Sequence, residues 1–204
     1  MSTDLHRERL DAVLHEIRGS EARCVVDLGC GNGELLVWLR ELDQITRLIG
    51  IDIDTTVLAE ARQALNIDMF NPSAELKVCR GSFENTDWYS KGGDGSIDAA
   101  IMLETIEHIE PGRLSRVEDT VFRALRPPLV IITTPNKEYN PIHGMADHEI
   151  RHPGHFFEWT RAQFRSWCEG VAGRHRYTAR YADIGETHPT LGSSTQMVCF
   201  ESDQ

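Results

Sequence analysis

The stretch CVVDLGCGNG, residues 24–33, decides the fold of this chain. Its apolar start predicts a short buried strand, which ends in Asp27 and a series of alternate glycines, Gly29, Gly31 and Gly33. Glycines in such a series let the backbone turn tightly and approach a ligand, which a Cβ atom would prevent. In open α/β sheets, ligands bind beyond the carboxyl ends of the strands, where the first strand-to-helix loop lies. The stretch therefore predicts an α/β sheet with a ligand on this loop.

Strand and helix patterns alternate along the rest of the chain. Helical spacing of apolar residues predicts helices over 5–18, 34–42, 55–65, the stretch after Glu104 as far as Leu125, and 161–168. Apolar runs predict strands over 48–51, 76–79, 97–104 and 129–134, and two segments near 176–183 and 195–201 would complete the sheet. This alternation favours parallel strands joined by right-handed crossovers, hence a doubly wound, mostly parallel, Rossmann-like α/β sheet with helices on both faces.

The composition limits the classes of function. With 204 residues, 40% of them hydrophobic, and no repeat or linker, the chain is expected to form a single domain. Its five scattered cysteines predict neither a disulfide framework nor a zinc cluster, which is typical of a cytoplasmic protein. No apolar run approaches the ~20 residues of a membrane span, so no membrane partner is expected. A net charge of −11 disfavours a grip on a long nucleic-acid backbone, so any nucleic-acid substrate should be held locally.

A second acidic residue strengthens the prediction of a ligand. Asp52 ends the second predicted strand, 19 residues after Gly33, where its carboxylate can accept hydrogen bonds from both hydroxyls of a ribose. Dinucleotide-binding loops usually carry G-x-G-x-x-G, and the glycine spacing here differs. Asp27 also suits a ligand with an ammonium and a sulfonium better than one with phosphates. The alternative is that the glycines serve only a tight turn and that Asp52 is only a strand-end acid.

VVDLGCGNG and GIDID resemble class I methyltransferase sequences, and the resemblance covers roughly residues 20–135. It implies S-adenosylmethionine as the cofactor and a sheet of about seven strands with the last one antiparallel. It also implies positions for the parts of the cofactor. Asp27, Gly29, Gly31 and Gly33 would line the methionine part, Asp52 would hold the ribose, Ser82 and Phe83 would border the adenine, and Met102 and Leu103 would pass beneath the sulfur.

Glu104, Glu107 and His108 follow the fourth predicted strand at i, i+3 and i+4. If the segment is helical, the three side chains share a face. Two neighbouring carboxylates repel each other unless a positive group lies between them, and a divalent cation is one such group. Many class I methyltransferases of the ubiquinone-biosynthesis kind carry a similar segment, in which these residues bound the cofactor or cap a helix. The triplet alone leaves both interpretations open.

Taken together, ETIEHI (104–109), TPNKEYN (134–140) and RHPGHFFEWTRAQF (151–164) resemble the Hen1 family of small-RNA 3′-terminal 2′-O-methyltransferases, over about residues 100–170. The resemblance implies that Glu104, Glu107, His108 and His155 bind a divalent metal and form the catalytic centre. Where many members have Asp-His, this chain has Gly154-His155, so a carboxylate that orients the imidazole is expected to be missing. Phe156, Phe157, Trp159, Phe164 and Trp167 are expected in the core, and His148 and His152 in supporting or solvated positions.

The chemistry implied is methyl transfer to the 2′-hydroxyl of an RNA 3′ end, with the metal chelating the free 2′ and 3′ hydroxyls. Mn²⁺ or Mg²⁺ is expected, and the imidazole ligands also suit Co²⁺ or Fe²⁺. We expect residues 1–204 to form one methyltransferase domain. Its parts are an N-terminal helix (1–19), a cofactor-binding core (20–135), a segment that binds the metal and the RNA end (136–170) and closing strands (171–204). Bacterial family members often work beside an RNA repair kinase-phosphatase-ligase, which is therefore an expected partner.

Two other functions remain open from the sequence. In one, the protein is a metal-independent methyltransferase of a small molecule, and the E-x-x-E-H segment is structural. In the other, it is a non-catalytic domain that binds cofactor or RNA within a repair assembly. A neutral His108 or His155 that binds no metal could also act as a general base.

Overall fold

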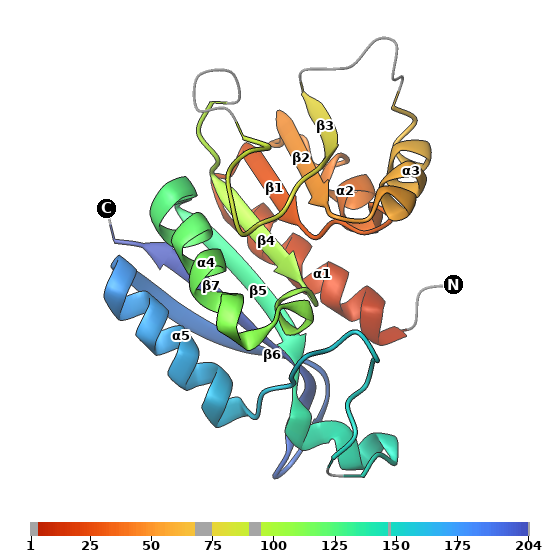
Figure 1. Cartoon of the computed structure of the whole chain (residues 1–204), viewed down its shortest axis with the longest axis vertical. Coiled ribbons are helices and arrows are strands. Elements are labelled where there is room, and N and C mark those ends of the chain that lie inside the picture. The colour runs from red at the N-terminus through yellow and green to blue at the C-terminus, as the bar shows by residue number, and fades with distance from the viewer. Residues whose placement is uncertain (1–3, 68–74, 90–94, 147, 204) are drawn as a thin grey trace.

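The computed structural model describes residues 4–67, 75–89, 95–146 and 148–203 (Figure 1). A seven-stranded sheet runs through it in the order β3-β2-β1-β4-β5-β7-β6. The strands are β1 (Cys24–Leu28), β2 (Arg47–Asp52), β3 (Leu76–Arg80), β4 (Ala99–Leu103), β5 (Leu129–Pro135), β6 (Tyr177–His188) and β7 (Gly192–Ser202). β1 to β5 pair in parallel, and β7 runs antiparallel to both of its neighbours. The predicted fold class, with the last strand antiparallel, is confirmed.

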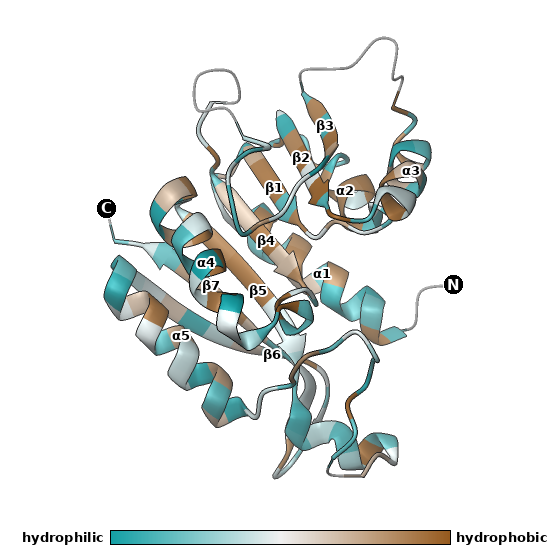
Figure 2. Ribbon diagram, in the orientation of Figure 1, coloured by the Kyte–Doolittle hydropathy of each residue, from teal (hydrophilic) through white to brown (hydrophobic). Residues whose placement is uncertain are grey.

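Helices cover both faces of the sheet. They are α1 (Asp4–Gly19), α2 (Glu34–Leu39), α3 (Thr55–Ala64), α4 (Leu114–Glu118) and α5 (Arg161–His175), and α4 continues as a π-helical turn over Asp119–Leu125. Figure 1 shows α4 and α5 in front of the sheet and α1 behind it. Successive strand residues point to opposite faces: Val25 packs with the α1–α3 side and Val26 with the α4–α5 side. Figure 2 shows the hydrophobic strands that result in the middle of the sheet. Among the described helices, none offers the long apolar run that crossing a bilayer requires.

The segment after β4 differs from the predicted helix. Glu104 has a left-handed backbone with φ 50°, and a 3₁₀ turn over Ile106–His108 follows it. The backbone N–H of Glu104 donates to the carbonyl and to Oγ1 of Thr133 at 3.2 and 3.0 Å, which ties the turn to the end of β5. After a second 3₁₀ turn at Pro111–Arg113, regular helix begins only at Leu114. The turn therefore holds its side chains above the carboxyl ends of β4 and β5.

The last helix is longer than predicted. α5 continues beyond Cys168 to His175, because Val171 and Ala172 extend its buried face. Its start is fixed by a reciprocal cap: the side chain of Thr160 accepts from the N–H of Gln163, and the Gln163 side chain accepts from the N–H of Thr160. The segment between β5 and α5 contains a further 3₁₀ helix over Lys137–His143. It lies beside the carboxyl edge of the sheet.

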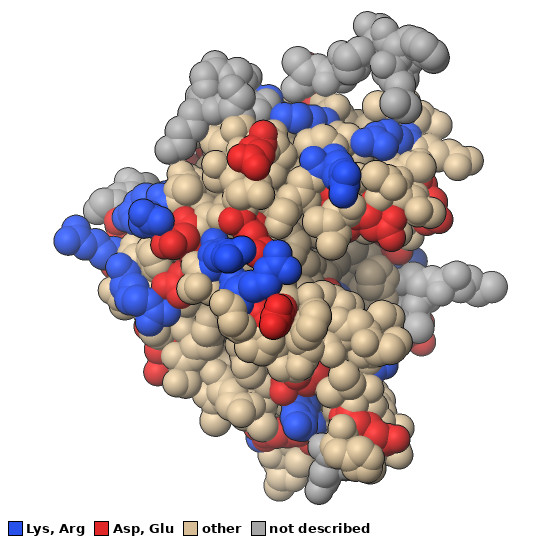
Figure 3. All heavy atoms as spheres, viewed as in Figure 1, with Lys and Arg blue, Asp and Glu red and all other residues tan. Residues whose placement is uncertain are grey.

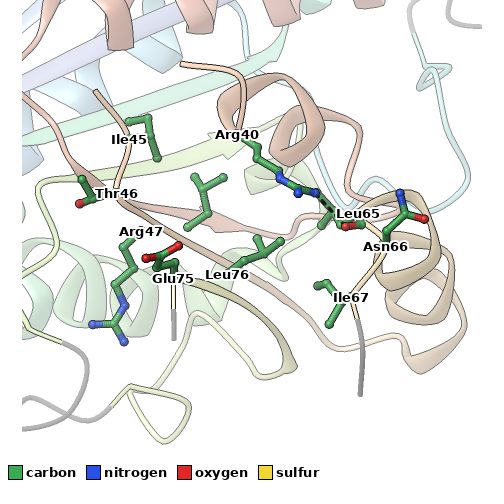
Figure 4. Close-up of a pocket in the computed structure, with 10 residues that line it drawn as sticks. Arg40, Ile45, Thr46, Arg47, Leu65, Asn66, Ile67, Glu75 and Leu76 are labelled. Carbon is green, nitrogen blue, oxygen red and sulfur yellow. Dashed lines mark hydrogen bonds between the residues drawn. The ribbon is translucent and has the colours of Figure 1, made fainter. Parts of the chain in front are cut away.

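A hollow of about 420 Å³ lies at the opposite edge of the sheet (Figure 4). Arg47 and Leu76, at the amino ends of β2 and β3, line it, together with Leu65 at the end of α3. Arg40 closes one side by donating from Nη1 to the carbonyl of Leu65 at 2.9 Å. Because ligands of such sheets bind at the carboxyl ends of the strands, this hollow is at the wrong edge for the ligand of the glycine loop.

Candidate functional site

The loop between β1 and α2 requires glycine at two positions. Gly29 and Gly33 have φ values of 88° and 82°, and a Cβ atom on them would lie 2.6 Å from Cγ2 of Thr105 and 2.9 Å from Cβ of Ala61. A Cβ on Gly31 would meet no described protein atom within 4 Å. The N–H groups of Gly29 and Cys30 both donate to the carbonyl of Ile51 at 2.9 Å. The loop is thus held against β2 and open on its outer side.

Asp52, the last residue of β2, is joined to this loop by a hydrogen bond. Its Oδ2 accepts from the N–H of Gly31 at 3.0 Å, and its Oδ1 accepts from the N–H of Asp54 at 2.9 Å. The carboxylate therefore lies at the carboxyl end of β2, directly beside the glycines. A ligand on the loop would come within reach of its remaining lone pairs.

Asp27 is buried at the end of β1. Burial raises the pKa of its carboxyl to about 7, and the neighbouring charge of Asp52 adds to the rise. A carboxyl with these surroundings is stabilised in its charged form by a cation. The ammonium of an amino-acid ligand is such a cation.

The other residues predicted to bind the cofactor lie after β3 and in β4. Ser82 and Phe83 are half-buried, and Nε1 of Trp88 donates to the carbonyl of Ser82 at 3.0 Å. The side chain of Met102 is fully buried among residues of the α4–α5 side, whereas that of Leu103 is half-buried on the α1–α3 side. Within β4, these side chains therefore point to opposite faces of the sheet.

The structure brings Glu104 and Glu107 together beside β5. Oε2 of Glu104 pairs with Nη2 of Arg9 on α1 at 2.9 Å, and Oε2 of Glu107 accepts from Oγ1 of Thr134 at 3.0 Å. The Oε1 atom of each glutamate is buried and has no hydrogen-bond partner among the described residues. Burial raises the pKa of both carboxyls, and repulsion from Glu104 raises that of Glu107 further. Two orphaned carboxylate oxygens in one place fit a cation between them.

The two predicted imidazole ligands each have one ring nitrogen fixed by a hydrogen bond. Nδ1 of His108 lies 3.0 Å from the carbonyl of Gly154, and Nδ1 of His155 lies 2.7 Å from Oε1 of Glu158. Both partners only accept, so each Nδ1 carries a proton and each neutral ring keeps its lone pair on Nε2. Nε2 of His155 faces Oε1 of Glu107 at 3.9 Å. Burial, followed by the neighbouring His155, lowers the pKa of His108, which favours its neutral form.

Glu158 is a supporting residue that the sequence interpretation missed. Its buried carboxylate accepts from His155, from the N–H of Arg151 and from Nδ2 of Asn140, each at 2.7 Å. These donors, aided by the charge of Arg151, hold its pKa below the ordinary value although burial alone would raise it. The expectation that an orienting carboxylate is missing at Gly154 is therefore wrong, because Glu158 orients His155. The His-x-x-Glu spacing of 155 and 158 was the signal for it.

Arg151 anchors this arrangement to the sheet. Its guanidinium donates to Oδ1 of Asn140 at 2.7 Å, to the carbonyl of Asn136 at 2.6 Å and to the carbonyl and Oγ of Ser194 at 2.9 and 3.0 Å. Asn136 follows β5 and Ser194 belongs to β7. The loop that carries His155 is therefore fixed to both strands.

The remaining histidines have other surroundings. His152 lies in the same cluster, and its ring and those of His108 and His155 offer ligand atoms within 4.8 Å of one another. However, Nδ1 of His152 accepts from the N–H of Gly154 at 3.0 Å, which places the proton of a neutral ring on Nε2 and makes that atom a donor. His143 pairs with Oγ of Ser194 at 3.0 Å, and His148 is exposed. The predicted set of two carboxylates and two imidazoles suits Mg²⁺ or Mn²⁺ better than three imidazoles do, because these ions prefer oxygen ligands.

Comparisons with known proteins show which family the chain belongs to. A family model described as a methyltransferase domain matches residues 25–128. The small RNA 2′-O-methyltransferases of Gallus gallus and Arabidopsis thaliana are 33% and 31% identical to this chain, over 96% of it, and the matches cover 53% and 22% of those proteins. The crystal structure of the methyltransferase domain of bacterial CtHen1-C is similar with a TM-score of 0.85 and 36% identity, over 98% of this chain and 100% of that one. The chain thus spans about half the length, or less, of the curated relatives it matches.

Proposed function

Because the chain belongs to the Hen1-type family of class I methyltransferases, we propose that it methylates the 2′-hydroxyl of the 3′-terminal nucleotide of RNA, with S-adenosylmethionine as the methyl donor. The observation that carries this proposal is that the buried Oε1 atoms of Glu104 and Glu107 have no hydrogen-bond partner among the described residues, and that the one of Glu107 lies 3.9 Å from Nε2 of His155. A metal-independent methyltransferase has no need of two unpartnered carboxylate oxygens next to its cofactor loop. An enzyme that grips a vicinal diol through a divalent ion does.

The glycine loop and its acids would bind the cofactor. Asp27, Gly29, Gly31 and Gly33 would surround its methionine part, with the Asp27 carboxylate against the ammonium. Asp52 would accept from the ribose hydroxyls, and Ser82 and Phe83 would border the adenine. Met102 and Leu103, at the end of β4, would support the loop beneath the sulfonium, and the fully buried Met102 would do so through its backbone.

Glu104, Glu107, His108 and His155 would hold the divalent ion. When bound, Mn²⁺ or Mg²⁺, or alternatively Co²⁺ or Fe²⁺, would supply a Lewis acid and coordination positions for the terminal 2′ and 3′ hydroxyls. The protein's part is to hold the 2′ oxygen in line with the sulfonium methyl group. A new O–C bond then forms as the C–S bond breaks, and the hydroxyl proton leaves to water or to a neutral imidazole that is not ligated.

The proposal extends to the organisation and partners of the chain. Residues 1–204 would be one methyltransferase domain, in which 1–19 form the N-terminal helix, 20–135 bind the cofactor, 136–170 bind metal and RNA end, and 171–204 supply the closing strands. A chain of the same fold, 23% identical with a TM-score of 0.67, occurs in a Pnkp1/Rnl/Hen1 RNA repair complex. We include an RNA repair kinase-phosphatase-ligase among the partners of this chain.

The test incubates the protein with labelled S-adenosylmethionine, Mn²⁺ and a short RNA that ends in 2′ and 3′ hydroxyls. Matched RNAs carry a 3′-phosphate or a 2′-deoxy end. We expect label only in the first RNA, and loss of that label in His155→Ala with cofactor binding retained. Equal labelling of the RNA with a 3′-phosphate would refute recognition of the terminal diol.

Two further outcomes would select the alternatives. Full activity in a chelator, with little loss in Glu104→Ala, would identify a metal-independent methyltransferase. Binding of cofactor and Mn²⁺ without any methyl transfer would identify a non-catalytic domain of a repair assembly.

A further inference from the structure

A shallow groove of about 650 Å³ lies between α4 and α5, on the face of the sheet that these helices cover. Six of the residues that line it are Leu114, Trp159, Gln163, Ser166, Trp167 and Arg174. Leu114 begins α4, and the last four belong to α5. Between Gln163 and Arg174, α5 rises by about 16 Å at ~1.5 Å per residue, so the groove has room for more than one nucleotide or amino-acid side chain.

The groove begins at the candidate active site. Trp159 directly follows Glu158, the residue that orients His155, and forms an isolated bridge with Asn136 at the carboxyl end of β5. The carbonyl of Trp159 accepts from the N–H of Lys137 at 3.0 Å and from Nε2 of Gln196 at 2.9 Å. A polymer whose last unit lies at His155 can therefore continue along Trp159 without leaving the surface.

Aromatic rings form one side of the groove. The rings of Trp159 and Trp167 are stacked with 5.3 Å between their centroids and 29° between their planes, and Phe157 lies 4.4 Å from Trp159. Both tryptophans are only half-buried: they pack against the core and also line the groove. The sequence interpretation placed them in the core, which explains only one side of each ring. Half-exposed aromatic rings are the platforms on which single-stranded nucleic acids stack their bases.

Arginines flank the groove although the chain as a whole carries a charge of −11. Figure 3 shows basic side chains, with acidic ones beside them, on the face that α4 and α5 cover. Arg113 and Arg116, 49% and 68% exposed, share the single carboxylate of Glu84, with N–O distances of 2.6 and 3.9 Å. Arg174 bridges α5 to Glu118 of α4 with two hydrogen bonds of 2.7 and 2.9 Å. Two guanidinium groups beside Leu114 thus share one carboxylate.

We propose that this groove binds the nucleotides that precede the terminal one in a single-stranded RNA. Bases pack against the exposed parts of the Trp159 and Trp167 rings that the two rings do not cover for each other, and the phosphates lie on the side of Arg113 and Arg116. The proposal rests on the proposed function, since the terminal nucleotide has to lie at His155 for the strand to enter the groove. It also accounts for how an acidic protein holds RNA: a few contacts near the end replace a long basic surface.

The experiment compares two RNAs with the same 3′ end, a dinucleotide and an RNA of about twelve nucleotides, as substrates and as ligands. We expect the wild-type KM for the longer RNA to be lower by about tenfold, the effect of one stacked base. Trp167→Leu should make the two KM values equal. Quenching of tryptophan fluorescence by the longer RNA, measured with cofactor present, should weaken by about the same factor in this variant.

Two exposed substitutions guard against a folding defect in Trp167→Leu. Arg116→Glu and Gln163→Glu should each weaken binding of the longer RNA about tenfold or more at low salt, because each adds a negative charge beside the strand. Arg18→Glu, at the far end of α1, is the matched control and should behave as wild type. Unchanged KM and quenching in all three groove variants would overturn the proposal, and that result is also the one expected if the groove receives a polypeptide. The quenching needs no methyl transfer, so it separates failure of the groove from failure of the proposed function.

Discussion

Nδ1 of His155 donates a hydrogen bond of 2.7 Å to Oε1 of Glu158, three residues further along the same loop. This bond decides which nitrogen of the ring is free. With the proton held on Nδ1, the lone pair of Nε2 points to the side of Glu107. The ligand position of His155 is therefore set by a residue that does not itself face the proposed ion.

Glu158→Gln is expected to weaken metal binding while the protein stays folded. The amide can still accept from His155, but it has no charge to hold the ring, and its NH₂ group opposes the donor of Asn140. Loss of such a supporting carboxylate typically costs about 10–100-fold in metal affinity or activity. Titration of Mn²⁺ followed by calorimetry measures the change. His152→Ala is the control, because that ring accepts only from the N–H of Gly154, and equal losses in the two variants would contradict the assigned role.

The metal-free protein should lose stability as the pH rises. The pKa of the Glu107 carboxyl is raised well above the ordinary value in the folded chain. Between the unfolded and the folded pKa, the folded chain therefore binds more protons than the unfolded chain. The free energy of unfolding then falls between the unfolded and the folded pKa, and the loss is complete above the folded pKa. Thermal melts in chelator at about pH 5.5 and about pH 8 should show a smaller drop in Glu107→Gln than in wild type.

Addition of Mn²⁺ should stabilise wild type at the higher pH and leave Glu107→Gln nearly unchanged, because the ion needs the charged carboxylate. A wild-type melting temperature that Mn²⁺ does not raise would argue against the four-ligand site.

Asp27→Asn should make the cofactor-free protein more stable and weaken its binding of the cofactor. The folded pKa of Asp27 is raised to about 7 by burial and by Asp52, so its carboxyl costs free energy once the pH exceeds its unfolded value, and the cost is full above the folded one. The neutral amide avoids that cost. Without cofactor, the variant should gain at least about 1 kcal/mol over wild type near pH 8 and nothing near pH 4. Binding of S-adenosylmethionine should weaken at the same time, and calorimetry with both proteins would reveal a result of the opposite sign.

Gly29→Ala should destabilise the protein by about 2–4 kcal/mol, because it combines a left-handed backbone with a contact of 2.6 Å to Cγ2 of Thr105. Thr105→Ser removes that methyl group and keeps Oγ1, which donates to the carbonyl of Leu103. In the serine background, the cost of Gly29→Ala should fall toward the ~1–2 kcal/mol of backbone strain. Denaturant unfolding of the four proteins of this cycle measures the coupling, and additive effects would show that the contact is relieved elsewhere.

The fold could be predicted because its signals are local. The alternation of apolar strands and amphipathic helices, and the glycines after β1, are written in consecutive residues. That Glu104, Glu107 and His108 lie close together could be predicted too, but the helical geometry expected for them is not the one observed. Their side chains do not share the face of an α-helix, because the backbone of Glu104 is in the left-handed conformation and a 3₁₀ turn follows it. Thr133 and Thr134 of β5 hold this turn, and contacts between distant segments leave no periodic pattern in the sequence.

The supporting residues were harder to find for the same reason. Asn140, Arg151 and Glu158 come from one stretch of 19 residues, but only their three-dimensional bonds show that they act on His155. The position directly before His155 carries no carboxylate, because it is Gly154. The carboxylate that orients His155 belongs to Glu158, three residues later, and the backbone carbonyl of Gly154 supports His108 instead.

Gly154 has a consequence for how this site changes in evolution. A Cβ atom there would lie 3.0 Å from Nδ1 of His152 and 3.1 Å from Nδ1 of His108, so both rings have to move by a few tenths of an ångström before a larger residue fits. Nδ1 of His108 is held by the carbonyl of Gly154, and Nδ1 of His152 accepts from the N–H of the same residue. A side chain at position 154 is therefore expected to displace both rings, and a smaller residue at 152 would relieve one of the two contacts. Positions 152 and 154 should covary among relatives, with histidine at 152 accompanied by glycine at 154.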